Sequence, residues 1–113
     1  MRAKKVQDIL AIKYGIEIGS LDENGYGESV ISEREICYCC QDPNCTRHEL
    51  QFGQADRKLS KALGLWVWLC PTCHSQAHRV KYMIDDFHKL AQSECDRWYG
   101  EGTFCRVFQR NYL

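Results

Sequence analysis

The sequence LCPTCHSQAH, residues 69–78, contains a Cys-x-x-Cys step that matches the step in CYCC, residues 37–40. This spacing lets a tight turn direct both sulfurs at one metal ion, and two such steps supply the thiolates of a closed structural zinc site. A long segment separates the steps, so a shared zinc ion would join distant parts of the chain and contribute directly to folding. The predicted zinc ligands are Cys37, Cys40, Cys70 and Cys73.

The remaining cysteines leave this ligand set partly open. Cys39 and Cys45 lie near the first step and could replace one of the predicted ligands. Cys95 and Cys105 stand far from both steps and are expected to be buried thiols. A disulfide framework is the other use of many cysteines, but the paired spacing and the lack of a signal-like N-terminus favour zinc in a reducing, cytoplasmic location.

Composition limits the function classes. A chain of 113 residues is one small domain by size, and such a core often depends on a metal or a cross-link. The longest apolar run, residues 63–70, is too short to cross a bilayer, so no membrane role is expected. Fifteen basic and fifteen acidic residues give a net charge of +0, which by itself does not favour a nucleic-acid partner.

Basic residues are nevertheless concentrated around the second cysteine step. No Asp or Glu occurs between residues 57 and 81, whereas the acidic excess lies between Glu17 and Glu35. The local charge predicts a DNA-binding surface, although solvated surface residues would give the same pattern. The predicted nucleic-acid contacts are Arg57, Lys58, Lys61, Arg79 and Lys81.

Apolar spacing predicts a helix near each end of the chain. The N-terminal helix covers residues 2–14 and precedes a polar loop, so residues 1–35 are treated as an N-terminal helix and loop. Residues 36–113 hold the metal ligands. In this part, a stripe over residues 84–98 predicts a helix with its apolar side chains in the core, ended by glycine and followed by a short aromatic tail.

The central part predicts two short strands and a helix. Residues 50–52 are a candidate strand, and the apolar, aromatic run at residues 65–69 is a second strand that ends at the second cysteine step. Pro71 suits the first turn of a helix, so the helix should begin there.

Three histidines form a second candidate metal site within these elements. His74 and His78 are four residues apart and share one face of the predicted helix. The strands would hold His48 opposite them. Two alternatives are a Cys2His2 finger, whose linker would be far longer than that fold uses, and ordinary surface or capping histidines. His88 lies outside the cluster and is expected to be an ordinary histidine.

These residues resemble the HNH nucleases of the ββα-metal fold. The resemblance covers residues 37–113 and implies an α+β fold with a zinc-stapled, treble-clef-like core and flanking N- and C-terminal helices. It also implies one divalent cation, Mg²⁺, Mn²⁺, Ni²⁺ or Zn²⁺, that helps cleave a phosphodiester bond. The tail at residues 108–113 is similar to that of a small phage-borne group. The matching motifs are RHE at 47–49, Gly53, Arg57, Ser60, GL at 64–65, LCPTCH at 69–74 and His78.

The first motif departs from the family pattern, in which a metal ligand precedes a histidine base. Either His48 is the ligand and Glu49 stands at the base position, or His48 is the base and Arg47 occupies the ligand position, which is chemically poor. The first assignment is preferred. The middle Asn of the motif, which braces the loop carrying the base, has no counterpart in residues 58–67. The candidate catalytic residues are His48, Glu49, His74 and His78.

Two functions follow as hypotheses. The first is a metal-dependent DNA endonuclease, nicking or structure-directed, acting in phage recombination, replication or packaging in the cytoplasm of a bacterial host. Its candidate partners are DNA and a phage or host protein. The second is a non-catalytic zinc-binding module that contacts DNA or a protein. A redox or metal-relay role for Cys39 and Cys40 is a third reading, although adjacent cysteines are poorly placed for disulfide exchange.

Overall fold

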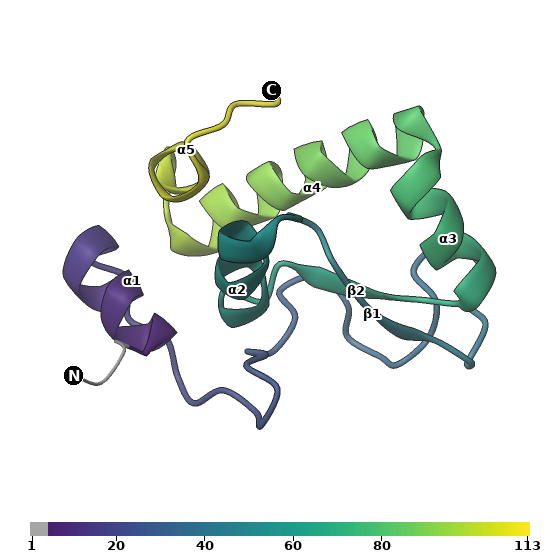
Figure 1. Cartoon of the computed structure of the whole chain (residues 1–113), viewed down its shortest axis with the longest axis horizontal. Coiled ribbons are helices and arrows are strands. Elements are labelled where there is room, and N and C mark those ends of the chain that lie inside the picture. The colour runs from purple at the N-terminus through teal and green to yellow at the C-terminus, as the bar shows by residue number, and fades with distance from the viewer. Residues whose placement is uncertain (1–4) are drawn as a thin grey trace.

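The computed structural model describes residues 5–113 (Figure 1). This part of the chain contains five helices and one two-stranded sheet, so the predicted α+β class is confirmed. None of its helices is both long and apolar enough to cross a membrane. In chain order the elements are α1 (Val6–Tyr14), β1 (Thr46–Glu49), α2 (Gln54–Ala62), β2 (Trp66–Leu69), α3 (Pro71–Arg79), α4 (Lys81–Tyr99) and α5 (Thr103–Phe108).

The N-terminal helix α1 begins at Val6, and residues 2–4 of the predicted helix lie outside the described part of the chain. Gly15 ends α1 in a left-handed conformation, with φ of 68°, and its N–H donates to the carbonyl of Ala11 at 3.1 Å. Glycine adopts this conformation without a steric penalty. Leu10 packs α1 into the core, and no helix or strand follows until β1, as the polar loop predicts.

The two strands pair antiparallel, with His48 of β1 opposite Val67 of β2. Because side chains alternate along a strand, Thr46 and His48 share one face of β1 while Arg47 and Glu49 share the other. The adjacent residues Arg47, His48 and Glu49 of the first motif therefore do not all face the same side of the sheet.

One strand prediction is confirmed and the other is wrong. The run at residues 65–69 forms β2, whereas residues 50–52 are not a strand, because the chain pairs with β2 through the preceding residues. A last bond from Leu50 N to Leu65 O, at 3.0 Å, ends the ladder. The chain then bends towards Gly53, which has φ of 95°. His48 therefore lies inside a strand and not before it.

The helix α4 runs along the sheet and connects α3 to α5 (Figure 1). It confirms the predicted helix over residues 84–98 and extends it. The prediction that Trp98 is a core residue is wrong: it is 60% exposed, because its indole N–H donates to the carbonyl of Val30, 3.1 Å away, near the surface. The predicted aromatic tail contains the short helix α5, and α2 was not predicted.

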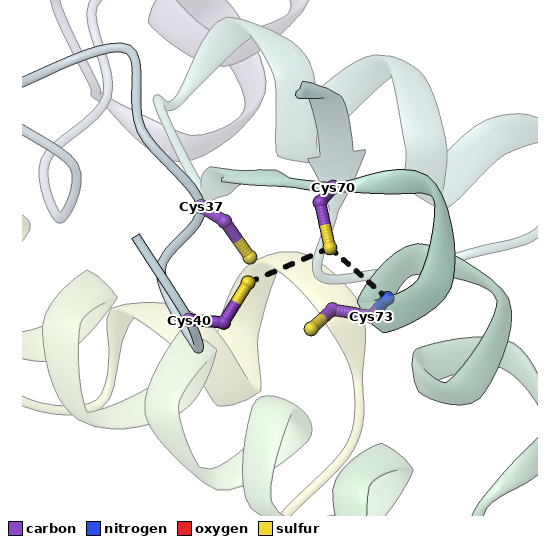
Figure 2. Close-up of side chains that lie close together, drawn as sticks. All are labelled: Cys37, Cys40, Cys70 and Cys73. Atoms are coloured by element: carbon purple, nitrogen blue, oxygen red, sulfur yellow. Dashed lines mark hydrogen bonds between the residues drawn. The ribbon is translucent and has the colours of Figure 1, made fainter. Parts of the chain in front are cut away.

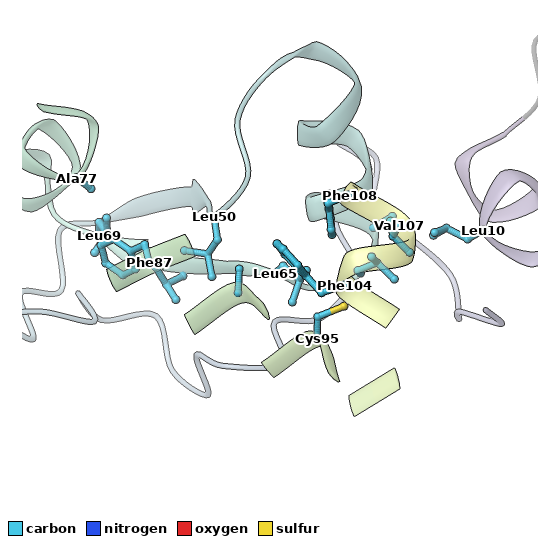
Figure 3. Packing of buried hydrophobic residues seen from close by; sticks show 14 of the residues in the cluster. Leu10, Leu50, Leu65, Leu69, Ala77, Phe87, Cys95, Phe104, Val107 and Phe108 are labelled. Atoms are coloured by element: carbon cyan, nitrogen blue, oxygen red, sulfur yellow. The ribbon is translucent and has the colours of Figure 1, made fainter. Parts of the chain in front are cut away.

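Buried apolar side chains from all five helices and β2 form one core (Figure 3). The core lies between α4 and the sheet and reaches α1 and α5 at one end. It holds β2 and α3, which carry the second cysteine step, in fixed positions. Its fully buried members include Leu10, Leu50, Leu63, Leu65, Val67, Leu69, Ala77, Ala91, Cys95 and Phe104.

The substitution Gly64→Ala is expected to lower the free energy of unfolding by about 3 kcal/mol. Gly64 has φ of +75°, and an added Cβ would overlap the backbone oxygen of Glu28. Gly15→Ala is the matched control, since Gly15 has φ of +68° and open space at its Cβ position. It should cost about 1 kcal/mol from backbone conformation alone. Urea denaturation measures the free energy of unfolding of both variants. Equal losses of stability would show that the predicted overlap with Glu28 does not destabilise the protein.

Candidate functional site

The four cysteines of the two predicted steps come together in space (Figure 2). Their sulfurs lie within 4.8 Å of one another, and the Cys40 and Cys70 sulfurs are 3.6 Å apart. A tetrahedron with zinc–sulfur bonds of about 2.3 Å has edges of about 3.8 Å. The grouping predicted from the sequence is confirmed, and its geometry and donor atoms fit a metal ion such as zinc.

Local hydrogen bonds shape the first cysteine turn. Gln41 N donates to Cys37 O at 2.8 Å, and Gln41 takes a left-handed conformation with φ of 67°. Tyr38 N donates to the carbonyl of Trp68 at 2.7 Å, which connects the turn to β2. The first step is therefore fixed beside the strand that leads into the second step.

The second cysteine turn forms the start of α3. Cys70 is the N-cap of α3 and Pro71 occupies its first turn, as predicted. The Cys70 sulfur accepts a hydrogen bond from the backbone N–H of Cys73 at 3.4 Å (Figure 2). A sulfur that accepts backbone N–H bonds is stabilised as a thiolate, which is the form that binds metal.

The metal-free thiols of this group ionise unequally. Burial opposes ionisation of Cys37, but hydrogen bonds from the backbone of Cys70, Cys40 and Cys39 outweigh it and lower the pKa of Cys37 to about 6. Burial, followed by the neighbouring sulfurs of Cys70 and Cys37, raises the pKa of Cys73. Four thiolates crowded together repel one another, so a cation is needed for all four to be ionised.

The other cysteines lie outside the four-sulfur group. Cys39 and Cys45, which the sequence left as alternative ligands, are not members of it. Burial is the main cause that raises the pKa of the Cys39 thiol. Cys95 is fully buried on α4, as expected, whereas Cys105 on α5 is only partly buried.

The second group contains His48 of β1 and the α3 histidines His74 and His78. Their nearest ring nitrogens lie within 4.8 Å of one another, and the ring centroid of His48 is 4.9 Å from each of the other two. His48 is buried, His74 is partly buried and His78 is exposed. The group is therefore anchored in the protein on one side and open to solvent on the other.

The buried histidine has a polar atom without a partner. His48 Nε2 accepts or donates no hydrogen bond among residues 5–113, although it is shielded from solvent. A buried nitrogen in this state is costly unless an ion or water satisfies it. Three imidazole donors with an open side match the ligand number of catalytic zinc sites. The arrangement could hold a metal ion.

Thr46 adds a contact that the sequence did not predict. Its hydroxyl lies 3.0 Å from His74 Nδ1, so that nitrogen is used in a hydrogen bond and Nε2 is left for another partner. The signal was the spacing of two residues between Thr46 and His48, which places both on one face of a strand. A strand at residues 50–52, as the sequence predicts, would not include Thr46 or His48, whereas β1 includes both.

Burial disfavours the charged forms of His48 and His74. It is the main cause that lowers the pKa of His48 to about 3, with the positive charges of protonated His74 and His78 as smaller causes. Burial also lowers the pKa of His74, and a charged His78 lowers it further. Neutral imidazoles keep the lone pairs that metal binding requires.

A cavity of about 310 Å³ opens beside the histidines, and Glu49 and Arg57 also line it. Arg57 Nε lies 3.8 Å from Glu49 Oε1, and most of the Glu49 side chain is buried. Arg47 also borders this cavity, but its guanidinium lies over the aromatic rings of Tyr26 and Trp66, at 4.3 and 5.0 Å. The cavity thus combines imidazoles, a carboxylate and a cationic group.

Of the five basic residues predicted to contact DNA, one lines the histidine cavity. Arg57 lines the histidine cavity, and Arg79 is exposed at the end of α3. Lys58 and Lys61 line a different cavity, between α1, α2 and α5. Lys81 Nζ is 3.0 Å from the Asp85 carboxylate.

His88 does not belong to the histidine group. Its ring stacks on Tyr112 with a centroid distance of 4.4 Å, so it packs α4 against the C-terminal residues.

Comparison of the chain with protein-family models, with curated proteins and with solved structures found no match. The residues of the two groups themselves are therefore the evidence for function.

Proposed function

We propose that this protein is a metal-dependent DNA endonuclease of the HNH type. The observation that carries the proposal is the group of three imidazoles, His48, His74 and His78, on one open site beside a cysteine group suited to zinc. In this proposal the two antiparallel strands and α3 would be the strands and helix of a ββα-metal core, with α2 inserted between the strands. The zinc-stapled core would be treble-clef-like.

The three histidines would hold the second cation, which when bound neutralises charge on the phosphate and on the leaving oxygen. Imidazole ligands suit Zn²⁺ and Ni²⁺ better than Mg²⁺, which prefers oxygen ligands. The buried His48 nitrogen without a partner is the atom most in need of such a ligand. We therefore expect Zn²⁺ or Ni²⁺ to bind here more tightly than Mg²⁺.

Glu49 is the proposed base, and Arg57 the proposed phosphate contact. Both line the cavity beside the histidines. A carboxylate near the reacting water can accept its proton, and a guanidinium can bind phosphate through parallel hydrogen bonds. Arg47 is held by aromatic rings and by Asp22, 3.2 Å away, which disfavours it as a metal ligand. This supports His48 as the ligand in preference to His48 as the base.

A non-catalytic module on the same fold is the second candidate. The observation in its favour is the ion pair of Glu49 with Arg57, in which the Glu49 side chain is only 14% exposed. A carboxylate engaged in this way is a poor base unless substrate phosphate draws the guanidinium away. The protein would then bind DNA or a partner protein without cutting.

Incubation of the zinc-loaded protein with supercoiled plasmid and with branched DNA separates the two candidates. Mg²⁺, Mn²⁺, Ni²⁺ and Zn²⁺ are added separately. Nicked or linear products that require an added cation support the endonuclease. Retarded DNA without cleavage under every cation supports the module, and neither binding nor cleavage contradicts the endonuclease and leaves only a module that binds a partner protein.

Thr46→Val is expected to weaken metal binding at the histidine group by about 10- to 100-fold. Valine keeps the shape of threonine but removes the hydroxyl that lies 3.0 Å from His74 Nδ1. The ring of His74 would then rotate or change tautomer more freely. Isothermal titration with Zn²⁺ on protein already loaded at the cysteines measures the effect. Thr72→Val, at an exposed position of α3, is the control, and equal affinities for both variants would contradict the positioning role.

A further inference from the structure

A large groove lies on the face of the sheet opposite the histidines. Its volume is about 780 Å³, and residues 20–33 form one wall. The other wall carries Trp66, Trp68 and Trp98, which are all three tryptophans of the chain. Trp66 and Trp68 alternate with Val67, which faces the core, so their rings emerge on the face that also carries Arg47.

Hydrogen bonds fix the loop wall of this groove against the sheet and α4. Trp66 Nε1 donates to Gly27 O at 2.9 Å, and the Ser29 hydroxyl donates to the carbonyl of Trp66 at 2.6 Å. Trp98 Nε1 donates to Val30 O at 3.1 Å. The groove is therefore formed before any partner binds, which reduces the entropy lost on binding.

One guanidinium already occupies the inner end of the groove. Arg47 Cζ lies 4.3 Å from the ring centroid of Tyr26, 5.0 Å from that of Trp66 and 5.2 Å from that of Trp68. The Asp22 carboxylate, 3.2 Å from Arg47 Nη2, balances its charge. This end shows the combination of aromatic faces and a carboxylate that binds a planar cation.

The groove also carries acidic side chains without a cationic partner. Glu28 and Glu33 line it, both are exposed, and neither forms an ion pair with any residue from 5 to 113. Trp98 lines it too, with 60% of its surface exposed. We propose that this groove is a docking site for a basic segment of a partner protein, with an arginine side chain of the segment against Trp98 and the two glutamates.

Charge distinguishes this occupant from nucleic acid. Aromatic rings also stack on bases, but Glu28 and Glu33 would repel the phosphates that accompany them. Arg57, which could attract phosphate, lines the histidine cavity and not the groove, although the two share Tyr26 and Arg47 in their linings. Docking in the groove does not depend on whether the histidine site cuts DNA.

Tryptophan fluorescence of the zinc-loaded full chain tests the proposal, because every tryptophan lines the groove. The probe is a synthetic peptide of alternating arginine and glycine. There are two comparison ligands. One is the same peptide with glutamate in place of arginine, and the other is a single-stranded oligothymidylate. We expect saturable quenching by the arginine peptide alone. Stronger quenching by the oligothymidylate, or equal quenching by both peptides, would overturn the proposal.

Matched variants separate docking from general attraction between opposite charges. Glu28→Gln/Glu33→Gln is expected to weaken binding of the arginine peptide about 10-fold. Glu17→Gln/Glu35→Gln removes the same charge at exposed positions outside the groove and should change affinity less than 2-fold. All four positions are exposed, so circular dichroism should report the native fold for both variants. Equal weakening in the two variants would show that no specific site exists.

Discussion

Removal of the metal from the cysteine group is expected to unfold the protein. The same result is expected for Cys70→Ser, because Cys70 is buried, caps α3 and has its sulfur 3.6 Å from that of Cys40. Structural zinc contributes an apparent binding free energy of about 10–16 kcal/mol in small zinc-folded peptides. A domain of this size has a total stability of about 5–15 kcal/mol. The free energy lost with a zinc ion bound at this group would therefore match or exceed the total stability of the fold.

The position of the cysteine group explains why the effect should be global. The first turn contacts β2 through the bond from Tyr38 N to Trp68 O, and the second turn begins α3. Without a cation, ionised sulfurs this close would repel one another. The first turn and the start of α3 would then lose the connection that the shared ion gives them.

Circular dichroism and thermal denaturation measure this effect in the presence and absence of a strong chelator. Cys45→Ser is the matched control, since Cys45 lies near the first turn but outside the four-sulfur group. It should keep one tightly bound zinc and a melting temperature close to that of the unaltered protein. A folded Cys70→Ser variant with normal zinc content, or zinc loss in Cys45→Ser, would contradict the ligand assignment.

Sequence spacing was sufficient to predict those structural features that depend on short segments of the chain. The cysteine steps, the start of α3 at Pro71 and the shared face of His74 and His78 each depend on residues within one or two turns. Cys39 could not be separated from Cys40 in this way, because adjacent cysteines differ only in the direction that the turn gives each side chain. That direction depends on the bond between Gln41 N and Cys37 O.

Features determined by pairing between distant segments could not be predicted. The position of β1 depends on its register with β2, and a strand shifted by a few residues has the same local composition. The contact of Thr46 with His74 and the burial of His48 both follow from that register. Trp98 illustrates the same limit, since its place in an apolar helical stripe predicted burial, whereas a bond to Val30 keeps it at the surface.

His78→Gln is expected to abolish DNA cleavage, with a loss of about 10³-fold or more, while the fold is kept. His78 is the exposed member of the histidine group, so its replacement leaves no cavity in the core. Glutamine removes the imidazole that would bind the second cation but keeps a polar side chain of similar length. The structural zinc should remain bound, because the cysteine group does not include this residue.

The control for His78→Gln is His88→Gln, which removes the histidine that stacks on Tyr112 outside the group. Initial rates of plasmid nicking and metal content per chain are measured for both variants. We expect one zinc at the cysteine group in each, cleavage near the normal rate in His88→Gln, and none in His78→Gln. Unchanged cleavage in His78→Gln would exclude the histidine group as the catalytic centre. Equal losses in both variants would show that the effect comes from altered packing, since the two histidines share no proposed role in catalysis.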